Sequence, residues 1–342
     1  MLTEIYGSDR RAMAQVDALL TRVGIRRDGH LDYTCGIFDE GELIATGSCF
    51  GNTIRCLAVS GERQGEGLLN QVVSHLMEVQ AQRGNTHVFL YTKVGSARFF
   101  ADLGFYEIAR VDGELVFMEN RRTGFADYCA RLAKTRREGL SSAVVMNANP
   151  FTRGHLHLVE RAAAESDTVH LFVLSEEAGP IPFAVRRRLV RQGVAHLPNV
   201  ICHDSGPYII SAATFPSYFL KDEDTVTAAH ARLDLTVFGR IAETLGVTVR
   251  YVGEEPDSGV TALYNRIMAE HLPEVGVACR VIPRLTLNGR VVSASTVRQA
   301  IHDGTPETVA DMLPPATAAY FASAEAEPVI RAIQRQKEVR HH

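Results

Sequence analysis

This chain of 342 residues lacks a CxxC pair, a signal-peptide pattern and any long apolar run. Its six scattered cysteines favour free buried thiols over disulfides or a zinc site. The absence of a long apolar run and of a signal-peptide pattern predicts no membrane segment, and we expect a cytoplasmic protein. The net charge of −4 gives no electrostatic reason to expect binding to nucleic acid or to an anionic membrane.

The composition is that of a globular protein, with 46% hydrophobic and 22% charged residues. The length suggests about two domains of ordinary size. A basic, helix-patterned stretch over residues 120–140 ends near Gly139 and gives way to an apolar run. We therefore place a domain boundary there, which divides the chain into residues 1–138 and 139–342.

The first part has the pattern of a mixed α+β domain. The expected strands fall within residues 35–50, with a turn at Glu40 and Gly41, and then at residues 53–59 and 86–93. The expected helices cover residues 68–84 and 96–104, and both end at a glycine.

In the second part, strands alternate with amphipathic helices. The expected strands are residues 142–148, 168–175, 199–205, 247–253 and 278–284, and the clearest helices are 155–166, 183–197 and 224–245. This alternation predicts an α/β fold with a Rossmann-like, doubly wound parallel sheet. Ligands of such sheets bind outside the carboxyl ends of the strands.

The strongest local pattern runs from Asn149 to His155 and reads Asn-Pro-Phe-Thr-Arg-Gly-His. It follows a strand and opens a helix, where unpaired backbone N–H groups attract anions. Gly154 lets a phosphate or a base approach the backbone closely, because glycine has no side chain. Thr152 and His155 add side-chain donors for the α-phosphate of a nucleotide. The alternative is an ordinary turn in which Thr152 is a helix N-cap. The candidate nucleotide-binding residues here also include Asn149, Pro150 and Phe151.

A second pattern begins a helix after the last expected strand. It contributes three hydroxyl side chains and, one turn later, a guanidinium: Ser293, Ser295, Thr296 and Arg298. Such a helix start suits a second anion site. The alternative is a serine cap followed by a solvated arginine.

Taken in order, these two patterns resemble the HxGH nucleotidyltransferase superfamily over residues 141–320. Thr152, Gly154 and His155 match its first motif, although many members have histidine where Thr152 stands. Ser293, Ser295 and Arg298 match its second motif, with Val292 where isoleucine is usual. The resemblance implies that these residues bind ATP with Mg²⁺, and that His155, Thr152 and Arg298 stabilise charge on the α-phosphate.

The first part resembles the GNAT acetyltransferases over residues 1–120. The turn that contains Gly65 and Gly67 is similar to their acetyl-CoA pyrophosphate loop, and residues 97–105 are similar to a later helix and strand. Two positions depart from that pattern: Glu62 replaces glutamine or arginine, and Phe100 replaces a proton-donating tyrosine. The resemblance implies a domain that binds a CoA-like group without necessarily transferring acetyl from it. The alternative is a scaffold that only packs.

The two parts in this order resemble the citrate lyase ligase family. The resemblance implies that ATP and acetate form acetyl-AMP and pyrophosphate. It also implies that the thiol of a dephospho-CoA-derived prosthetic group, on the acyl carrier subunit of citrate lyase, then takes the acetyl group. Without the resemblance, the spacing of the motifs predicts only an enzyme of adenylyl transfer with a CoA-like partner. The alternative is a pantetheine-phosphate or mononucleotide adenylyltransferase with an appended GNAT-like domain.

Several weaker candidates accompany these motifs. Lys221 could bind phosphate or the acetate carboxylate, or be solvated beside two acidic residues. Of Arg186, Arg187 and Arg188 at most two can reach a site, because adjacent helix positions point in different directions, and we expect most of the run to be solvated. Tyr264 and Asn265 line an adenine pocket or simply pack.

Overall fold

The computed structural model describes residues 2–177, 179–209, 215, 218, 223–254 and 259–336. Lys221 lies outside the described residues. The chain forms two compact units, and neither is a single stretch of sequence. The first is Met1–Asp127 with Pro216–Ala229, and the second is Tyr128–Phe215 with His230–His342. The functional boundary near residue 138 stays a prediction.

The first unit is built on a seven-stranded mixed sheet in the order β1-β2-β3-β4-β5-β7-β6. Its strands are β1 (Leu2–Glu4), β2 (Tyr33–Asp39), β3 (Glu42–Phe50), β4 (Thr53–Val59), β5 (Phe89–Thr92), β6 (Tyr106–Val111) and β7 (Leu115–Glu119). The turn between β2 and β3 has Glu40 and Gly41 in left-handed conformations, as a tight hairpin requires.

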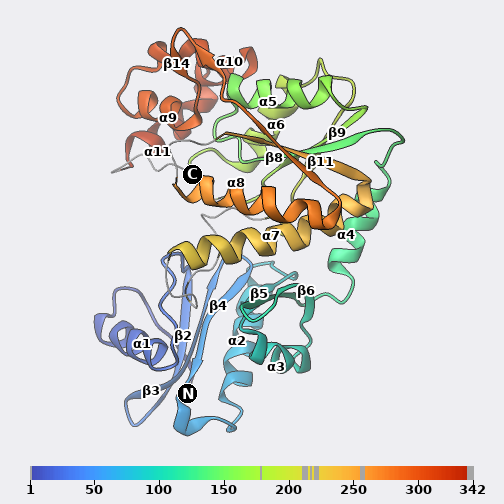
Figure 1. Ribbon diagram of the computed structural model, residues 1–342. Helices are drawn as coiled ribbons and strands as arrows, with labels where there is room; N and C mark the ends of the chain where they lie inside the picture. The colour runs from blue at the N-terminus through green and yellow to red at the C-terminus, as the bar shows by residue number, and fades with distance from the viewer. Residues whose placement is uncertain are drawn as a thin grey trace. The chain divides into compact units, whose positions relative to one another are not determined.

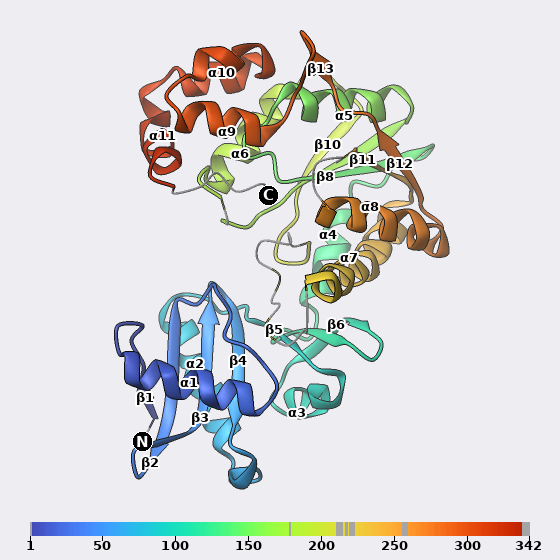
Figure 2. The ribbon, with the colours of Figure 1, turned by 60° about the vertical axis from the view of Figure 1, so that its left-hand side comes forward.

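The described helices of this unit cover both faces of its sheet. Those wholly within this unit are α1 (Arg10–Arg22), α2 (Leu68–Gln82) and α3 (Ala97–Asp102). Helix α1 begins where the Asp9 carboxylate accepts hydrogen bonds from the backbone N–H groups of Arg11 and Ala12, at 3.1 and 3.0 Å. Helix α1 packs on one face and α2 on the other (Figure 2), each over its own apolar cluster.

Strands β4 and β5 are the parallel pair of this sheet, and they part soon after they meet. Paired positions are limited to Thr53 with Phe89 and Ile54 with Leu90, although β4 continues to Val59 and β5 to Thr92. The carboxyl ends of the two strands are therefore not hydrogen-bonded to one another, and the space between them is open to a ligand.

The second unit contains a five-stranded parallel sheet in the order β10-β9-β8-β11-β12. Its strands are β8 (Ser141–Met146), β9 (Thr168–Val173), β10 (Val200–Asp204), β11 (Val247–Gly253) and β12 (Ala278–Ile282). A separate hairpin pairs β13 (Thr286–Leu287) with β14 (Arg290–Val291). The helices wholly within this unit are α5 (Arg153–Ala164), α6 (Phe183–Gly193), α8 (Gly259–His271), α9 (Ala294–His302), α10 (Pro315–Phe321) and α11 (Glu327–Gln334). Two more, α4 (Gly124–Ala133) and α7 (Glu223–Leu245), begin in the first unit and continue into this one.

Helices cover both faces of this parallel sheet, with α5 and α6 on one face and α7 and α8 on the other (Figure 1). Neighbouring residues of β11 contact the two layers. The Tyr251 hydroxyl donates to Glu165 at the end of α5 (2.8 Å), and Arg250 pairs with Asp234 of α7 (3.0 Å). The predicted α/β class and the doubly wound parallel sheet are confirmed.

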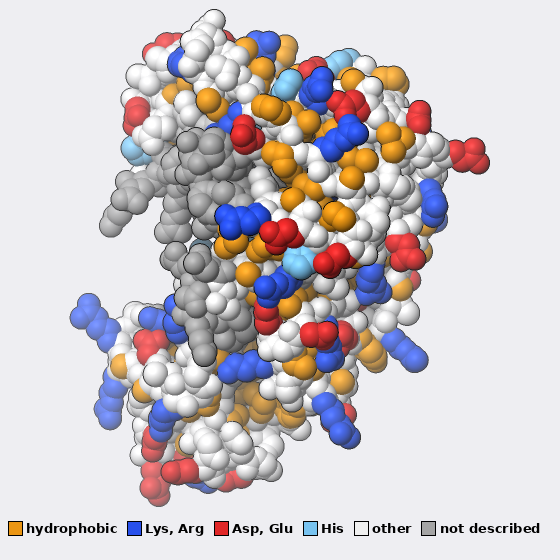
Figure 3. Space-filling model, in the orientation of Figure 1, with side chains coloured by type: hydrophobic (Ala, Val, Ile, Leu, Met, Phe, Trp, Pro, Cys, Tyr) orange, Lys and Arg blue, Asp and Glu red, His pale blue; other side chains and the backbone are white. Residues whose placement is uncertain are grey.

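Charged side chains of both signs are intermingled on the face shown in Figure 3. No helix within the described ranges is both long and apolar enough to cross a membrane.

Candidate active site

The site lies at the carboxyl end of β8, the central strand of the parallel sheet. The chain runs from β8 outward to β9 and β10, then returns to add β11 on the other side of β8. This reversal is the switch point at which doubly wound sheets bind ligands.

The turn that follows β8 is tightly packed: Asn149, Phe151 and Thr152 are buried. A methyl group added at Gly193 would lie 2.4 Å from the Phe151 ring, so a glycine in α6 is what admits that ring.

Thr152 and His155 cap the start of α5 reciprocally. The His155 backbone N–H donates to the Thr152 hydroxyl (3.4 Å), and the Thr152 backbone N–H donates to Nδ1 of His155 (3.1 Å). Since Nδ1 accepts a backbone N–H, the proton of the neutral ring resides on Nε2. Thr152 is thus the helix N-cap, as the alternative for this motif expected, and His155 keeps an Nε2–H donor for another acceptor.

The His155 ring is neutral at physiological pH. Burial, followed by the positive charges of Arg298 and Arg284, lowers the pKa of His155 from 6.5 to about 4. A neutral imidazole can donate a hydrogen bond to a phosphate oxygen without itself carrying charge.

The second predicted motif forms the start of α9. The Ser293 hydroxyl caps the helix by accepting from the Thr296 backbone N–H (3.0 Å), and it lies 3.0 Å from the Ser295 hydroxyl and 2.7 Å from that of Thr296. Ser295 and Thr296 also line a cavity of about 400 Å³ together with Arg290 and Gln299. That cavity is not lined by His155, Thr152 or Arg298. Of the residues in the second motif, Arg298 is therefore the one that directly contacts the first motif, whereas Ser295 and Thr296 face a separate cavity.

The structure brings the two helix starts together, although they are far apart in the sequence. Arg298 is 2% exposed and donates to the carbonyl oxygen of Asn149. A methyl group added at Gly154 would lie 3.2 Å from the carbonyl oxygen of Val292. Burial lowers the pKa of Arg298 to about 10, so it remains charged at neutral pH. The buried Arg298, the His155 ring and the starts of α5 and α9 therefore lie close to one another.

The Asn149 side chain is buried, and neither of its amide atoms has a hydrogen-bond partner among the described residues. Such unmade hydrogen bonds cost about 1–3 kcal/mol per buried group. A methyl group added at Gly179 would lie 1.8 Å from the Asn149 amide nitrogen. A polar side chain held so closely and left unsatisfied fits a site that a polar ligand completes.

Arg186 is the buried member of the arginine run, whereas Arg187 and Arg188 stay largely exposed, and the sequence did not indicate which of the three would be buried. Arg186 donates to four carbonyl groups: Ile181 (3.1 Å), Asn147 (2.7 Å), Leu174 (2.8 Å) and Glu176 (2.5 Å). It thereby ties together the segments that leave β8 and β9. No local pattern reveals this role, because the carbonyls come from separate loops.

The other weak candidates have local partners. Arg187 pairs with Asp204 (2.8 Å) and Arg188 with Glu325 (2.7 Å). The Tyr264 hydroxyl donates to Asp234 (2.6 Å), and the Asn265 amide donates to the Gly253 carbonyl (3.2 Å). These bonds serve packing, and an adenine pocket at these two residues stays a prediction.

Across the described ranges, no three or more histidine, cysteine or acidic residues are grouped to hold a metal ion.

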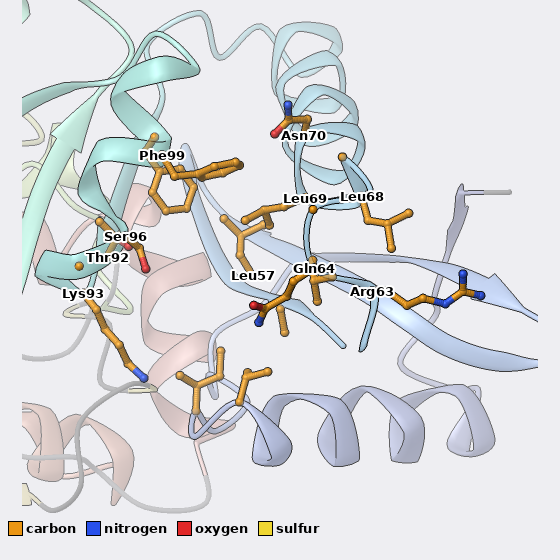
Figure 4. A pocket seen from close by; sticks show the side chains of 18 of the residues that line it. Leu57, Arg63, Gln64, Leu68, Leu69, Asn70, Thr92, Lys93, Ser96 and Phe99 are labelled. Carbon is orange, nitrogen blue, oxygen red and sulfur yellow. The ribbon is translucent and has the colours of Figure 1, made fainter. Parts of the chain in front are cut away.

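The first unit contains a cavity of about 630 Å³ at the parted ends of β4 and β5. Figure 4 shows Leu57, Gln64 and Leu69 on one side of it and Thr92 and Phe99 on the other.

The predicted glycine turn borders this cavity. Gly65 and Gly67 have φ values of +91° and +71°, which a side chain rarely tolerates, and Gly67 precedes α2 without a side-chain cap. Backbone N–H groups at this helix start are therefore available to a phosphate. Phe100 also lines the cavity and packs on Phe105, with a ring-centroid separation of 6.4 Å.

The fold and site define a two-part α/β protein with a polar site at the switch point of a Rossmann-like sheet. The family described as the citrate lyase ligase C-terminal domain matches residues 141–321. A citrate (pro-3S)-lyase ligase of Escherichia coli K12 is 35% identical over 94% of this chain and 93% of that protein. Those of Klebsiella pneumoniae and Haemophilus influenzae are 38% and 33% identical, over 82% and 94% of this chain and 83% and 98% of the relatives. The chain belongs to the citrate lyase ligase family and is an enzyme of the ligase class.

Solved structures are similar to about a third of the chain. Escherichia coli ElaA is 17% identical with a TM-score of 0.32, covering 35% of this chain and 99% of that one. An acyl-CoA N-acyltransferase of Pseudomonas aeruginosa is 16% identical with a TM-score of 0.31 and the same coverages.

Proposed function

We propose that this enzyme uses ATP to join acetate to AMP and then passes the acetyl group to a thiol on citrate lyase. In the first step an acetate oxygen attacks the α-phosphorus, an O–P bond forms, and pyrophosphate leaves. In the second step a thiolate attacks the acyl carbon, a C–S bond forms, and AMP leaves. The acceptor is the dephospho-CoA-derived group of the lyase acyl carrier subunit. The observation that carries this proposal is the convergence of the two helix starts in a member of this family.

The residues at β8 suit a triphosphate. Phosphoryl transfer requires alignment and charge neutralisation more than covalent action by the protein. His155 supplies a neutral Nε2–H donor, Arg298 a buried positive charge, and the N-termini of α5 and α9 supply backbone donors. Bound Mg²⁺ would neutralise phosphate charge, with phosphate oxygens as its principal ligands.

The cavity of the first unit supports a role in holding the CoA-like arm. Its apolar walls suit the pantetheine chain, and the turn at Gly65 and Gly67 offers N–H groups to a pyrophosphate. Phe100 cannot protonate a leaving thiolate, so this cavity is proposed to bind the arm while the second unit activates acetate.

The proposal is tested by exchange of labelled pyrophosphate into ATP, measured with the full chain, Mg²⁺ and either acetate or no acid. Exchange that requires acetate supports acetyl-AMP formation. Exchange that ignores acetate and requires phosphopantetheine would instead support the adenylyltransferase alternative. The His155→Ala variant should lose roughly 10²-fold or more of the exchange rate. Full activity of a folded His155→Ala protein would remove this site from the mechanism.

A further inference from the structure

Arg284 occupies a position that neither sequence motif includes. It lies between β12 and the β13–β14 hairpin, in which Thr286 pairs with Val291 and Leu287 with Arg290. The Val292 backbone N–H donates to the Leu285 carbonyl at 2.9 Å, which continues the pairing by one step. Arg284 directly precedes Leu285, and Ser293, the N-cap of α9, directly follows Val292, so both residues adjoin this hydrogen bond.

The same end of the hairpin also borders the first motif. The Val292 carbonyl oxygen lies close to Gly154 at the start of α5, where a methyl group added to the glycine would be 3.2 Å from it. The hairpin thus brings the segment that carries Arg284 to both helix starts. This contact depends on a turn at Asn288 and Gly289, both in left-handed conformations.

A backbone contact fixes the side chain of Arg284 at the ligand edge of the sheet. Its Nε donates to the carbonyl oxygen of Glu254 at 2.9 Å, and Glu254 directly follows β11. Arg284 therefore lies at the carboxyl ends of β11 and β12, the edge on which the turn after β8 also lies. Together with Arg298, its charge lowers the pKa of His155, which agrees with this placement.

We propose that Arg284 binds the pyrophosphate portion of ATP and stabilises it as the leaving group. This inference rests on the adenylation proposed above and adds a residue to that site. The turn at Thr152 and His155 is assigned to the α-phosphate, and we place the phosphates beyond it at the start of α9, whose backbone N–H groups and hydroxyls suit an anion. Arg284 stands beside that helix start, where a guanidinium would meet the charge that develops on the departing phosphates.

The test compares binding of ATP, inorganic pyrophosphate and AMP to the full chain with Mg²⁺, by isothermal titration calorimetry. The Arg284→Gln variant should bind pyrophosphate and ATP roughly 10–100-fold more weakly, because it loses a charge-assisted contact. Its affinity for AMP should be unchanged. Arg280→Gln is the matched control: Arg280 lies in β12 but pairs with Glu165, and all three affinities should stay at the wild-type values.

Arg284→Lys keeps the positive charge and should show intermediate pyrophosphate affinity with AMP binding intact, which separates a charge effect from a folding defect. Wild-type pyrophosphate affinity in Arg284→Gln would overturn the inference. Equal losses for AMP and ATP in both Arg284 variants would overturn it as well. If the wild type binds pyrophosphate but shows no acetate-dependent exchange, acetate activation fails while the role of Arg284 is still decided by these affinities.

Discussion

At the residue scale, the state of the His155 ring determines what the site can donate. The backbone N–H of Thr152 donates to Nδ1, and burial lowers the pKa to about 4, so the neutral ring with its proton on Nε2 should persist throughout the neutral range. Long-range ¹H–¹⁵N NMR of the full chain should show this tautomer and a titration midpoint near 4. A midpoint near 6.5, or a proton on Nδ1, would contradict the assignment.

Three histidines together predict how the stability of the second unit depends on pH. Burial is the largest cause that lowers the pKa of His155, His170 and His203 to about 4 in each case. The unfolded chain takes up protons near the ordinary value of 6.5, whereas the folded chain resists them until about pH 4. Stability should therefore be complete above pH 6.5 and decline as the pH falls toward 4.

Urea unfolding measured between neutral pH and about pH 4 tests this decline. His170 and His203 share a hydrogen bond of 3.0 Å between Nδ1 and Nε2. The His203→Gln variant removes one titrating ring and should weaken the dependence on pH. A stability that does not change over this range would show that the rings are not held neutral by the fold.

The residues of the two motifs could be recognised from sequence because each motif is local. Thr152, Gly154 and His155 lie within one helix turn, and so do Ser295 and Arg298. Arg186 and Arg284 could not be recognised this way, because their partners are backbone carbonyls in loops distant along the chain.

At the scale of elements, the close approach of the α5 and α9 starts requires a glycine at position 154. In Gly154→Ala the new methyl group would meet the Val292 carbonyl at 3.2 Å, tighter than an ordinary contact, so one helix start must shift. The substitution also favours helix by up to about 1 kcal/mol, so the fold should survive. We expect a marked loss of pyrophosphate exchange with little change in the thermal midpoint.

Gly239→Ala in α7 is the control for that variant. There the added methyl group meets Val275 at 3.5 Å, an ordinary contact, and activity should be unchanged. Normal exchange in Gly154→Ala would mean that the spacing of the two helix starts does not matter to the reaction.

Element type was largely predictable where the hydrophobic pattern is long. The helix expected at residues 224–245 is α7, and the strand at 247–253 is β11. The β13–β14 hairpin was not predicted, because its strands have two residues each, too few to show alternation. Its Asn288–Gly289 dipeptide is the one sequence signal that favours such a turn.

At the scale of the whole molecule, the first unit draws on sequence from the second half. Tyr218 is 6% exposed, its carbonyl oxygen accepts from the Arg26 backbone N–H at 2.6 Å, and its ring lines the cavity between β4 and β5. The local pattern around residue 218 cannot reveal which sheet it joins. For this reason the expected division at residue 138 did not include Pro216–Ala229 in the first unit.

A fragment that ends at residue 138 should therefore be less stable than the same unit in the intact chain. It would expose the apolar surface that Tyr218 covers beside Ile25, Cys56 and Ala58. Hydrogen exchange of the β4 amides would measure this in both proteins. A version with residues 215–229 joined by a flexible linker should recover protection. Equal protection in the short fragment would mean that the segment contributes nothing to that unit.

We propose that the starts of α5 and α9, far apart in the sequence, hold one triphosphate at the end of β8. A crystal structure of the full chain with a non-hydrolysable ATP analogue tests it most directly. We expect phosphate oxygens within hydrogen-bond distance of His155 Nε2 and Arg298. An analogue bound instead at the Gly65–Gly67 turn, or away from both of those side chains, would contradict it.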